Sequence, residues 1–343
     1  MNTGWLKPGP DDRGSEPFRS IYEHAIAKRE TNEIVVRRFE AYCKLYRATA
    51  RGIRRADPTA CIGGPALASG PMENSKDCGH CARGQGFARG LMIWCVQEKL
   101  PLDFVSWHEY FQPPQTIRRE ADIFRDYLRE FPSLERSVGS FMITEWNEAW
   151  WPDRPQDHEV GAAWCANTIT RAFLPGRIDR PCFFYVKQGD MNFRGDYSLL
   201  MQDNRPKPSY HVARVFNGLR GNWLPVGAPG TVAGGLGASF DEDVSGVASM
   251  DRESKRLSVL LVNFRDRYSL ARPVSLNIPG LPPELRRGVW VQRTLDATHA
   301  NVWNNRDASE LDVTAVGPLQ GGAFAWSGTL APNSVTLLEL RGR

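Results

Sequence analysis

Hydrophobic and polar positions alternate regularly through residues 34–219, in a pattern that predicts repeating strands and helices. Between residues 34 and 54, apolar side chains recur at every third or fourth position with charged residues between them, which predicts an amphipathic helix. The apolar run at residues 60–66, broken by glycine and proline, then predicts a buried strand and its exit turn. The pattern repeats, with strands expected at residues 103–108, from residue 141 through Glu145, and at 181–186, and helices at 86–99, 116–130, 158–173 and 209–219.

The predicted strands start about forty residues apart, and each is followed by a helix. Alternating apolar strands and helices indicate a parallel sheet covered by helices. This period suits one strand and helix of a TIM (β/α)8 barrel, but an eight-stranded barrel of roughly 250 residues needs four more such units. The α/β region at residues 32–221 is therefore expected to be half of a TIM barrel, preceded by an irregular segment at residues 1–31.

After Gly221 the pattern changes to short strands separated by Gly, Pro and Asp turns, without helical spacing. Residues 222–343 are therefore predicted to form an all-β domain, a β-sandwich that packs against the α/β domain and completes it. Trp290, Trp303 and Trp326 leave a carbohydrate-binding role open, although single tryptophans in a sandwich are more often core. The expected strands lie at residues 246–250, 257–263, 273–278, 288–292 and 334–340.

The composition narrows the class of protein. The 343 residues are 41% hydrophobic and 24% charged, which is unlike a fibrous or disordered chain. No stretch of about 18 uncharged apolar residues is present, so neither a membrane-spanning helix nor a membrane partner is expected. The net charge is only +4 and the basic residues are scattered, so nucleic acid is not an expected partner. The amino terminus lacks a signal-peptide pattern, which favours the cytoplasm unless a segment upstream of Met1 carries a signal.

The seven cysteines are odd in number, and most lie in apolar runs, where cysteine behaves as a small hydrophobic residue. The exception is Cys78-Gly79-His80-Cys81, in a polar loop. A closed zinc site requires four ligands and the sequence has no second CxxC pair, so we expect an unpaired loop pair or a local disulfide, with metal or redox function as the alternative. No metal site or cofactor is expected.

One predicted strand ends in distinctive chemistry. The apolar run that starts at Phe141 delivers Glu145, and Trp146 and Asn147 follow directly. An apolar strand that ends in a carboxylate next to aromatic and amide side chains is typical of the floor of a carbohydrate site. A glycosidase needs two carboxyl groups that flank the scissile bond. The sequence contains one convincing candidate.

Several short motifs follow one another in a fixed order between residues 34 and 220. They are Tyr42-Cys-Lys-Leu-Tyr46, Thr49-Ala-Arg-Gly-Ile53, Ala56-Asp57-Pro58, Ile62-Gly-Gly-Pro-Ala66, Asp103-Phe-Val-Ser-Trp-His-Glu-Tyr110, Ile143-Thr-Glu-Trp-Asn147 and Arg205-Pro-Lys-Pro-Ser-Tyr210. Their order and spacing resemble those of glycoside hydrolase family 39, the family of β-xylosidases and α-L-iduronidases within a large clan of retaining barrel glycosidases. Each motif alone is moderately specific, whereas the ordered set is strong.

The resemblance implies that the four strands are strands five to eight of the barrel and that Glu145, at the end of the seventh, is the catalytic nucleophile. His108 and Tyr110, at the end of the preceding strand, are expected to donate hydrogen bonds to it or to hold sugar hydroxyls. A structural histidine is the alternative for His108, and Glu148 is the rival nucleophile. The expected substrate-binding residues are His108, Tyr110, Trp146, Asn147, Tyr185 and Lys187.

The acid/base is where the chain departs from the family, which has an Asn-Glu-Pro motif upstream of the helix that carries Tyr42 and Tyr46. Glu16 precedes a proline, but the Pro- and Gly-rich residues before it cannot form a buried strand, and Glu23 is a weaker candidate. We therefore expect an incomplete chain that lacks the acid/base half, and self-association or a second chain that completes the barrel. A catalytically silent carbohydrate-binding or assembly module is the alternative.

The eighth strand also departs from the family. The chain reads Tyr185-Val-Lys187 where the family has a tryptophan and an aromatic or polar run. Lys187 would lie near the sugar, where a cation could bind the carboxylate of a uronic acid. A solvent-exposed lysine at a strand end is the simpler alternative. The sequence thus predicts an oligosaccharide or glycoside substrate without choosing the sugar.

Overall fold

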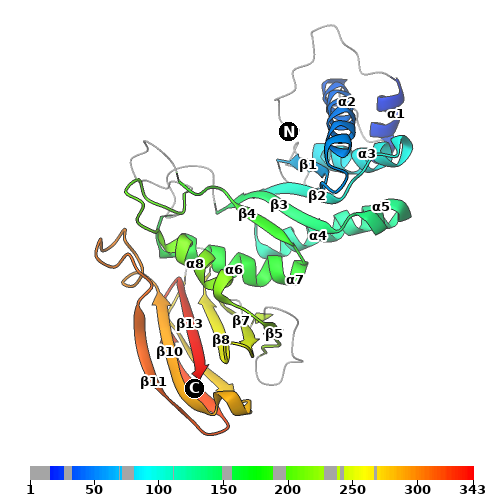
Figure 1. Cartoon of the computed structure of the whole chain (residues 1–343). Helices are drawn as coiled ribbons and strands as arrows, with labels where there is room; N and C mark the ends of the chain where they lie inside the picture. Colours follow the sequence, from blue (N-terminus) through cyan, green and yellow to red (C-terminus); the bar gives the residue numbers. More distant parts are fainter. Residues whose placement is uncertain are drawn as a thin grey trace. The chain divides into compact units, whose positions relative to one another are not determined.

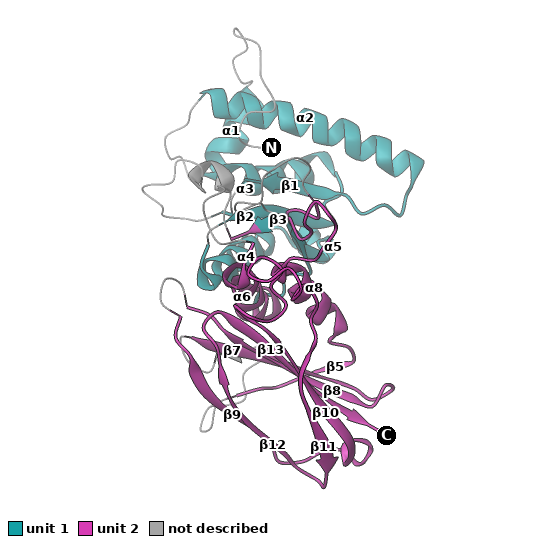
Figure 2. Cartoon of the chain, turned by 90° about the vertical axis from the view of Figure 1, so that its left-hand side faces the viewer, with its two compact units in different colours: residues 1–146, 176–183 teal, residues 147–175, 184–343 magenta. Residues whose placement is uncertain are grey.

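The computed structural model describes residues 16–26, 33–68, 70–71, 81–110, 112–148, 157–187, 198–227, 238–239, 243–265 and 269–343, without the side chains of residues 81–85 and 238–239. The chain folds as two compact units (Figure 2). The first contains residues 1–146 and 176–183, and the second contains residues 147–175 and 184–343.

The first unit is built on a four-stranded sheet with the order β1-β2-β3-β4 (Figure 1). β1 runs parallel to β2, and β3 runs parallel to β4. Each strand overlaps one of the predicted apolar runs, so the sequence prediction of four successive strands is confirmed. The strands are β1 (Gly63–Leu67), β2 (Phe104–Tyr110), β3 (Ser140–Asn147, whose last residue belongs to the second unit) and β4 (Arg180–Phe183).

Helices α2 (Glu33–Ala56), α3 (Cys81–Glu98), α4 (Pro114–Arg129) and α5 (Pro132–Ser137) complete most of this unit. α4 illustrates why they form, because its buried residues recur at every third or fourth position and Pro114 occupies the first turn, where a missing N–H is tolerated. Phe124 stacks on Trp107 with ring centroids 5.0 Å apart, which packs α4 against β2. Within the described part of the chain, none of the helices combines the length and the apolar composition needed to cross a membrane.

The irregular segment expected at residues 1–31 contains a helix, α1 (Glu16–Ala25), so that expectation is wrong for these ten residues. The helix forms because Phe18, Ile21, Tyr22 and Ala25 share one face and are buried. The ring centroids of Phe18 and Trp94 are 4.7 Å apart, which joins α1 to α3. A helix tolerates proline in its first turn, so Pro17 does not prevent it.

The second unit contains two antiparallel sheets. The larger has the order β11-β10-β13-β8-β7-β5, with β6 beside β7, and the smaller pairs β9 with β12. The β-sandwich predicted from the short apolar runs is confirmed, and β5, β6, β11 and β12 are additional strands. The strands are β5 (Asn222–Leu224), β6 (Ala238–Ser239), β7 (Val244–Asp251), β8 (Arg256–Asn263), β9 (Arg272–Ile278), β10 (Arg287–Leu295), β11 (Val313–Gln320), β12 (Phe324–Leu330) and β13 (Ser334–Gly342).

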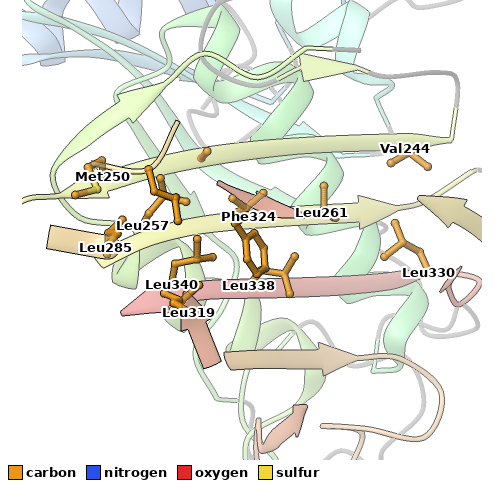
Figure 3. Packing of buried hydrophobic residues seen from close by; sticks show 13 residues of the cluster. Val244, Met250, Leu257, Leu261, Leu285, Leu319, Phe324, Leu330, Leu338 and Leu340 are labelled. Carbon is orange, nitrogen blue, oxygen red and sulfur yellow. The ribbon is translucent and has the colours of Figure 1, made fainter. Parts of the chain in front are cut away.

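A compact apolar core lies between the two sheets (Figure 3). Leu261, Leu338 and Phe324 are among its buried members, and they come from β8, β13 and β12. Trp290 and Trp326 pack against this core, which supports the structural interpretation of these two tryptophans.

The opposite face of the larger sheet is covered by helices. α6 (Glu159–Thr168) contacts β8 and β13, and it also packs against α8 (Pro208–Gly218). α6 continues into a π-helix (Ile169–Phe173) and the short α7 (Leu174–Gly176), so the helix predicted at 158–173 changes its hydrogen-bonding pattern for its last five residues. β7, β8 and β13 are buried along most of their length, and β8, which reads Leu257-Ser-Val-Leu-Leu-Val262, is a nearly continuous apolar run.

Candidate active site

Glu145 lies near the carboxyl end of β3 with its side chain 35% exposed, so solvent and small molecules reach the carboxylate. Tyr110 Oη donates a hydrogen bond to Glu145 Oε2 over 3.1 Å. His108 Nδ1 lies 3.3 Å from the same oxygen. The structure therefore brings together three of the residues that the sequence singles out, on two neighbouring strands.

Strand alternation explains this convergence. Successive side chains of a strand point to opposite faces, so His108 and Tyr110 share one face of β2, and Trp107 and Glu109 share the other. The first pair contacts Glu145 on β3, whereas Trp107 packs on α4. The residue order His-Glu-Tyr in β2 thus places two polar side chains on the Glu145 side and one on the helix side.

The protonation state of His108 follows from its surroundings. Burial lowers the pKa of His108 below its ordinary value of 6.5, although the nearby charge of Glu145 acts in the opposite direction. The imidazole is therefore neutral at neutral pH. A neutral ring beside a carboxylate is favourable only if it carries its hydrogen on the nitrogen nearest the oxygen, so we assign the hydrogen to Nδ1. Tyr110 then donates to Oε2, and the Nδ1–H of His108 lies beside the same oxygen, so both side chains restrict the orientation of the carboxylate.

Trp146 and Asn147 hold the end of β3. Trp146 is 3% exposed, and its ring packs edge-on against Phe183 with centroids 5.2 Å apart. Asn147 is buried, and its Nδ2 donates to the carbonyl oxygen of Phe184 over 2.7 Å. Its Oδ1 accepts a hydrogen bond from the backbone N–H of Glu148. Both side chains engage protein groups in this structure.

Tyr185 and Lys187 belong to the second unit. Tyr185 is half-buried, with its ring 4.6 Å from that of Phe184, and the peptide bond between these two residues is cis. Lys187 is exposed and donates from Nζ to Asn204 Oδ1 over 2.6 Å.

The alternative carboxylates lie in different environments. Glu148, the rival nucleophile, is buried directly after β3. Glu16 is 83% exposed in the first turn of α1, with Arg19 as its neighbour, and Glu23 lies on the same helix. Of these carboxylates and Glu145, only Glu145 both lies at a strand end and contacts Tyr110 and His108 of β2. Cys78 and the side chain of Cys81 lie outside the described residues, and within those residues no cluster of three His, Cys, Asp or Glu side chains suits a metal ion.

Two further carboxyl groups, Glu109 and Glu120, lie behind β2 and were not predicted from the sequence. Glu109 and Glu120 are 2% and 1% exposed, and Trp107 Nε1 donates to Glu109 Oε1 over 2.5 Å. Burial raises the pKa of Glu109 to about 7, and burial followed by the charge of Glu109 raises the pKa of Glu120 well above its ordinary value. The available signal is that Glu120 interrupts the apolar stripe of α4.

Comparison with known proteins identifies the family of this chain. The family model "Glycosyl hydrolases family 39" matches residues 30–307. A β-xylosidase from Geobacillus stearothermophilus is 27% identical over 210 residues, which are 52% of this chain and 37% of the relative. The chain thus spans well under half the length of this curated relative.

Solved structures show a similar fold. The GH39 enzyme from Xanthomonas axonopodis pv. citri has a TM-score of 0.67 and 16% identity, over 89% of this chain and 64% of that one. A monomeric β-xylosidase from Caulobacter crescentus has a TM-score of 0.64 and 16% identity, over 95% of this chain and 74% of that one. These neighbours imply a fold that combines a TIM barrel with a sandwich. The chain belongs to glycosyl hydrolases family 39.

Proposed function

We propose that this chain carries the nucleophile of a retaining, β-xylosidase-like glycoside hydrolase, and that Glu145 is that nucleophile. The observation that carries the proposal is the convergence of Tyr110 Oη and His108 Nδ1 on Glu145 Oε2 at the end of β3. The family and the β-xylosidase relatives support the reaction class.

In the proposed reaction, a carboxylate oxygen of Glu145 attacks the anomeric carbon and forms a glycosyl ester while the bond to the leaving-group oxygen breaks. A second carboxyl group protonates that oxygen and later takes a proton from the water that hydrolyses the ester. Two inversions at the anomeric carbon give net retention. Tyr110 and His108 orient the attacking carboxylate, and they are also within reach of sugar hydroxyls around it.

We infer that the four-stranded sheet corresponds to strands five to eight of the barrel and that the acid/base carboxyl comes from another segment or a second chain. The sequential order of the four strands supports this, as does the 37% share of the Geobacillus relative that the match covers. A sheet whose described strands end at β1 and β4 has two edges available for pairing. Self-association, or pairing with the missing half, would cover them.

The first experiment separates the nucleophile from the acid/base. An aryl β-xyloside with a dinitrophenolate leaving group needs no protonation in the first step, so the chain should form the glycosyl ester even without an acid/base. A 2-deoxy-2-fluoro-xyloside with the same leaving group should trap that ester. We expect intact-mass analysis to show one added fluoroxylosyl group, located by peptide mapping on Glu145.

Matched variants make the assignment specific. Glu145→Gln should abolish labelling, and Glu148→Gln should abolish it instead if the rival carboxylate is the nucleophile. Glu135→Gln removes one exposed carboxylate on α5 and should label normally. A folded chain that is never labelled, and that releases no dinitrophenol, would contradict the proposal and favour the alternative of a catalytically silent carbohydrate-binding or assembly module.

Lys187 is the proposed specificity residue, and a comparison of two substrates tests this role. If its ammonium binds a sugar carboxylate, an aryl uronide should react better than the matching xyloside, and Lys187→Met should remove that preference. If the wild type and Lys187→Met show the same relative activity on the uronide and the xyloside, Lys187 has no role in specificity and is only the exposed partner of Asn204.

A further inference from the structure

A second pair of carboxyl groups lies directly behind the strand that presents His108 and Tyr110. Glu109 on β2 and Glu120 on α4 are both buried, and their charges act on each other. The indole N–H of Trp107 donates to Glu109 Oε1. Glu109 Oε2 and Glu120 Oε2 are buried and receive no hydrogen bond from the described residues. Buried oxygens of this kind require a donor, and a proton held between the two carboxyls supplies it.

The surroundings contain no compensating cation among the described residues. The neighbouring charged residues of α4, Arg118, Arg119 and Asp122, are exposed, and no charged residue occurs in β1. On β2 and β3, the titratable groups His108, Tyr110 and Glu145 contact one another. Two ionised carboxylates cannot share a buried site without such a cation, so one proton stays with the pair.

The enclosure of the pair is tight. A Cβ added at Gly70 would lie 2.1 Å from Glu120 Cδ, so the backbone after β1 packs directly on this carboxyl. Trp107 is fully buried and stacks on Phe124 of α4. The pair therefore connects three segments: the carboxyl end of β2, the first half of α4, and the segment that follows β1.

We propose that Glu109 and Glu120 form a proton-sharing positioning pair, which fixes the carboxyl end of β2 and thereby the reach of His108 and Tyr110 to Glu145. Glu109 lies between His108 and Tyr110 in sequence and projects from the opposite face, so displacement of its backbone moves both donors together. The catalytic part of this inference rests on the proposed function, whereas the positioning part does not.

The pair gives the site a defined response to pH. While one proton is shared, the two carboxyls attract each other. When that proton leaves, two buried negative charges repel, β2 and α4 move apart at this point, and the contacts to Glu145 loosen. Glu120→Gln replaces the shared proton with a permanent amide donor, so the contacts should then persist to higher pH.

The structural test follows the backbone amides of residues 108 and 110 by ¹⁵N–¹H NMR between pH 5 and pH 9, in the full chain. In the wild type and in the exposed control Glu135→Gln, both amides should shift with one common midpoint, above the midpoint of the His108 ring itself. In Glu120→Gln this shared transition should disappear or move by at least about one pH unit. Glu109→Gln provides the same test if Glu120→Gln does not fold.

The catalytic test compares the alkaline limb of kcat on an activated aryl glycoside. Glu120→Gln should move the alkaline limb of kcat to higher pH. At one pH unit above the wild-type midpoint, kcat of Glu120→Gln should be at least about tenfold that of the wild type, with KM unchanged. Glu120→Ala should lose activity that the Gln variant retains. An identical limb and identical amide shifts in Glu120→Gln and wild type would overturn the positioning proposal. Absence of turnover in every variant would instead overturn the proposed function, and the NMR result would still decide the positioning.

Discussion

The buried carboxyl pair makes a quantitative prediction about stability. The pKa of Glu109 is about 7 in the folded protein, against an ordinary value of 4.5. Each tenfold difference in proton affinity is worth about 1.4 kcal/mol, so this difference corresponds to about 3 kcal/mol. The unfolded chain ionises first as the pH rises, because its Glu109 has the lower pKa. The stabilisation is therefore complete below about pH 4.5 and is lost as the pH rises to about 7.

Glu109→Gln isolates this effect. The amide has the same shape and does not titrate, so the variant should lack the pH-dependent loss that Glu109 causes. Urea denaturation at half-unit intervals from pH 4.5 to pH 8 measures the free energy of unfolding of both proteins. With a slope near 2 kcal/mol per molar urea, a loss of about 3 kcal/mol moves the midpoint by about 1.5 M.

The comparison is a difference between two curves, so titrating groups that do not interact with Glu109 cancel, and only its interacting neighbour Glu120 adds to the difference. We expect the wild-type curve to fall by about 3 kcal/mol more than that of Glu109→Gln between pH 4.5 and pH 7, and the curve of Glu135→Gln to follow the wild type. Curves for wild type and Glu109→Gln that run parallel within about 0.5 kcal/mol would refute the assignment of a raised pKa to this buried carboxyl.

Three further substitutions test other parts of the structure. Tyr110→Phe removes the hydroxyl that donates to Glu145 Oε2. Because a hydrogen bond to a charged group is worth about 1.5–3 kcal/mol, kcat/KM should fall about 10- to 100-fold while the melting temperature changes little. An unchanged kcat/KM would show that Tyr110 is not part of the active site. Leu338→Ala creates a cavity in the sandwich core and should lower the free energy of unfolding by about 2–5 kcal/mol, whereas the exposed Val316→Ala on β11 should have little effect. Lys207→Met leaves the buried Asp157 without its ammonium partner at 2.5 Å and should lower the free energy of unfolding by about 3–5 kcal/mol, measured by calorimetry or denaturant; an unchanged free energy of unfolding would contradict a stabilising role for this buried ion pair.

The four-strand α/β region could be predicted because its strands are buried and its helices are amphipathic. The segments at residues 34–54 and 116–130 have a clear helical period, and the structure forms α2 and α4 there. Helix α1 was missed because Pro17 and the Pro- and Gly-rich residues before it hide a short apolar face. That face, with Phe18 and Tyr22, gains its stability from packing on α2 and α3 rather than from its own sequence.

The sandwich strands divide in a similar way. β8 has a nearly continuous apolar run and β13 carries a valine and three leucines, because both strands are covered on both sides, and the sequence identifies them. β11 lies at the edge of its sheet and is mostly exposed, so its residues carry little hydrophobic signal. β11 is a strand because it pairs with β10, and this pairing cannot be read from the residues of β11 alone.

The candidate site could be predicted from the sequence where a strand end or a short motif identifies its residues. The ends of β2 and β3 and the family resemblance single out Glu145, His108 and Tyr110. In the structure, Tyr110 Oη and His108 Nδ1 lie 3.1 and 3.3 Å from Glu145 Oε2. The Glu109–Glu120 pair joins a strand to a helix, and nothing in either local pattern reports that their carboxyls meet. Trp146 and Asn147 were expected to bind sugar, and their burial became visible only with the neighbouring Phe183 and Phe184.

The cover that α6 provides for β8 and β13 has a consequence for dissecting this protein. The pattern of short strands starts near residue 222, so the sequence alone would suggest expressing residues 222–343 as a separate fragment. Such a fragment would lose α6 and α8, and with them the hydrogen bond between Asn167 and Ser245 and the one between Glu159 and Asn301. Strands with apolar residues on both faces would then meet water on one of them, so the fragment should precipitate. A fragment that includes residues 157–187 and residue 198 onward retains α6 and α8. These helices precede the sandwich in sequence but belong to its fold, so they cannot be removed as a linker.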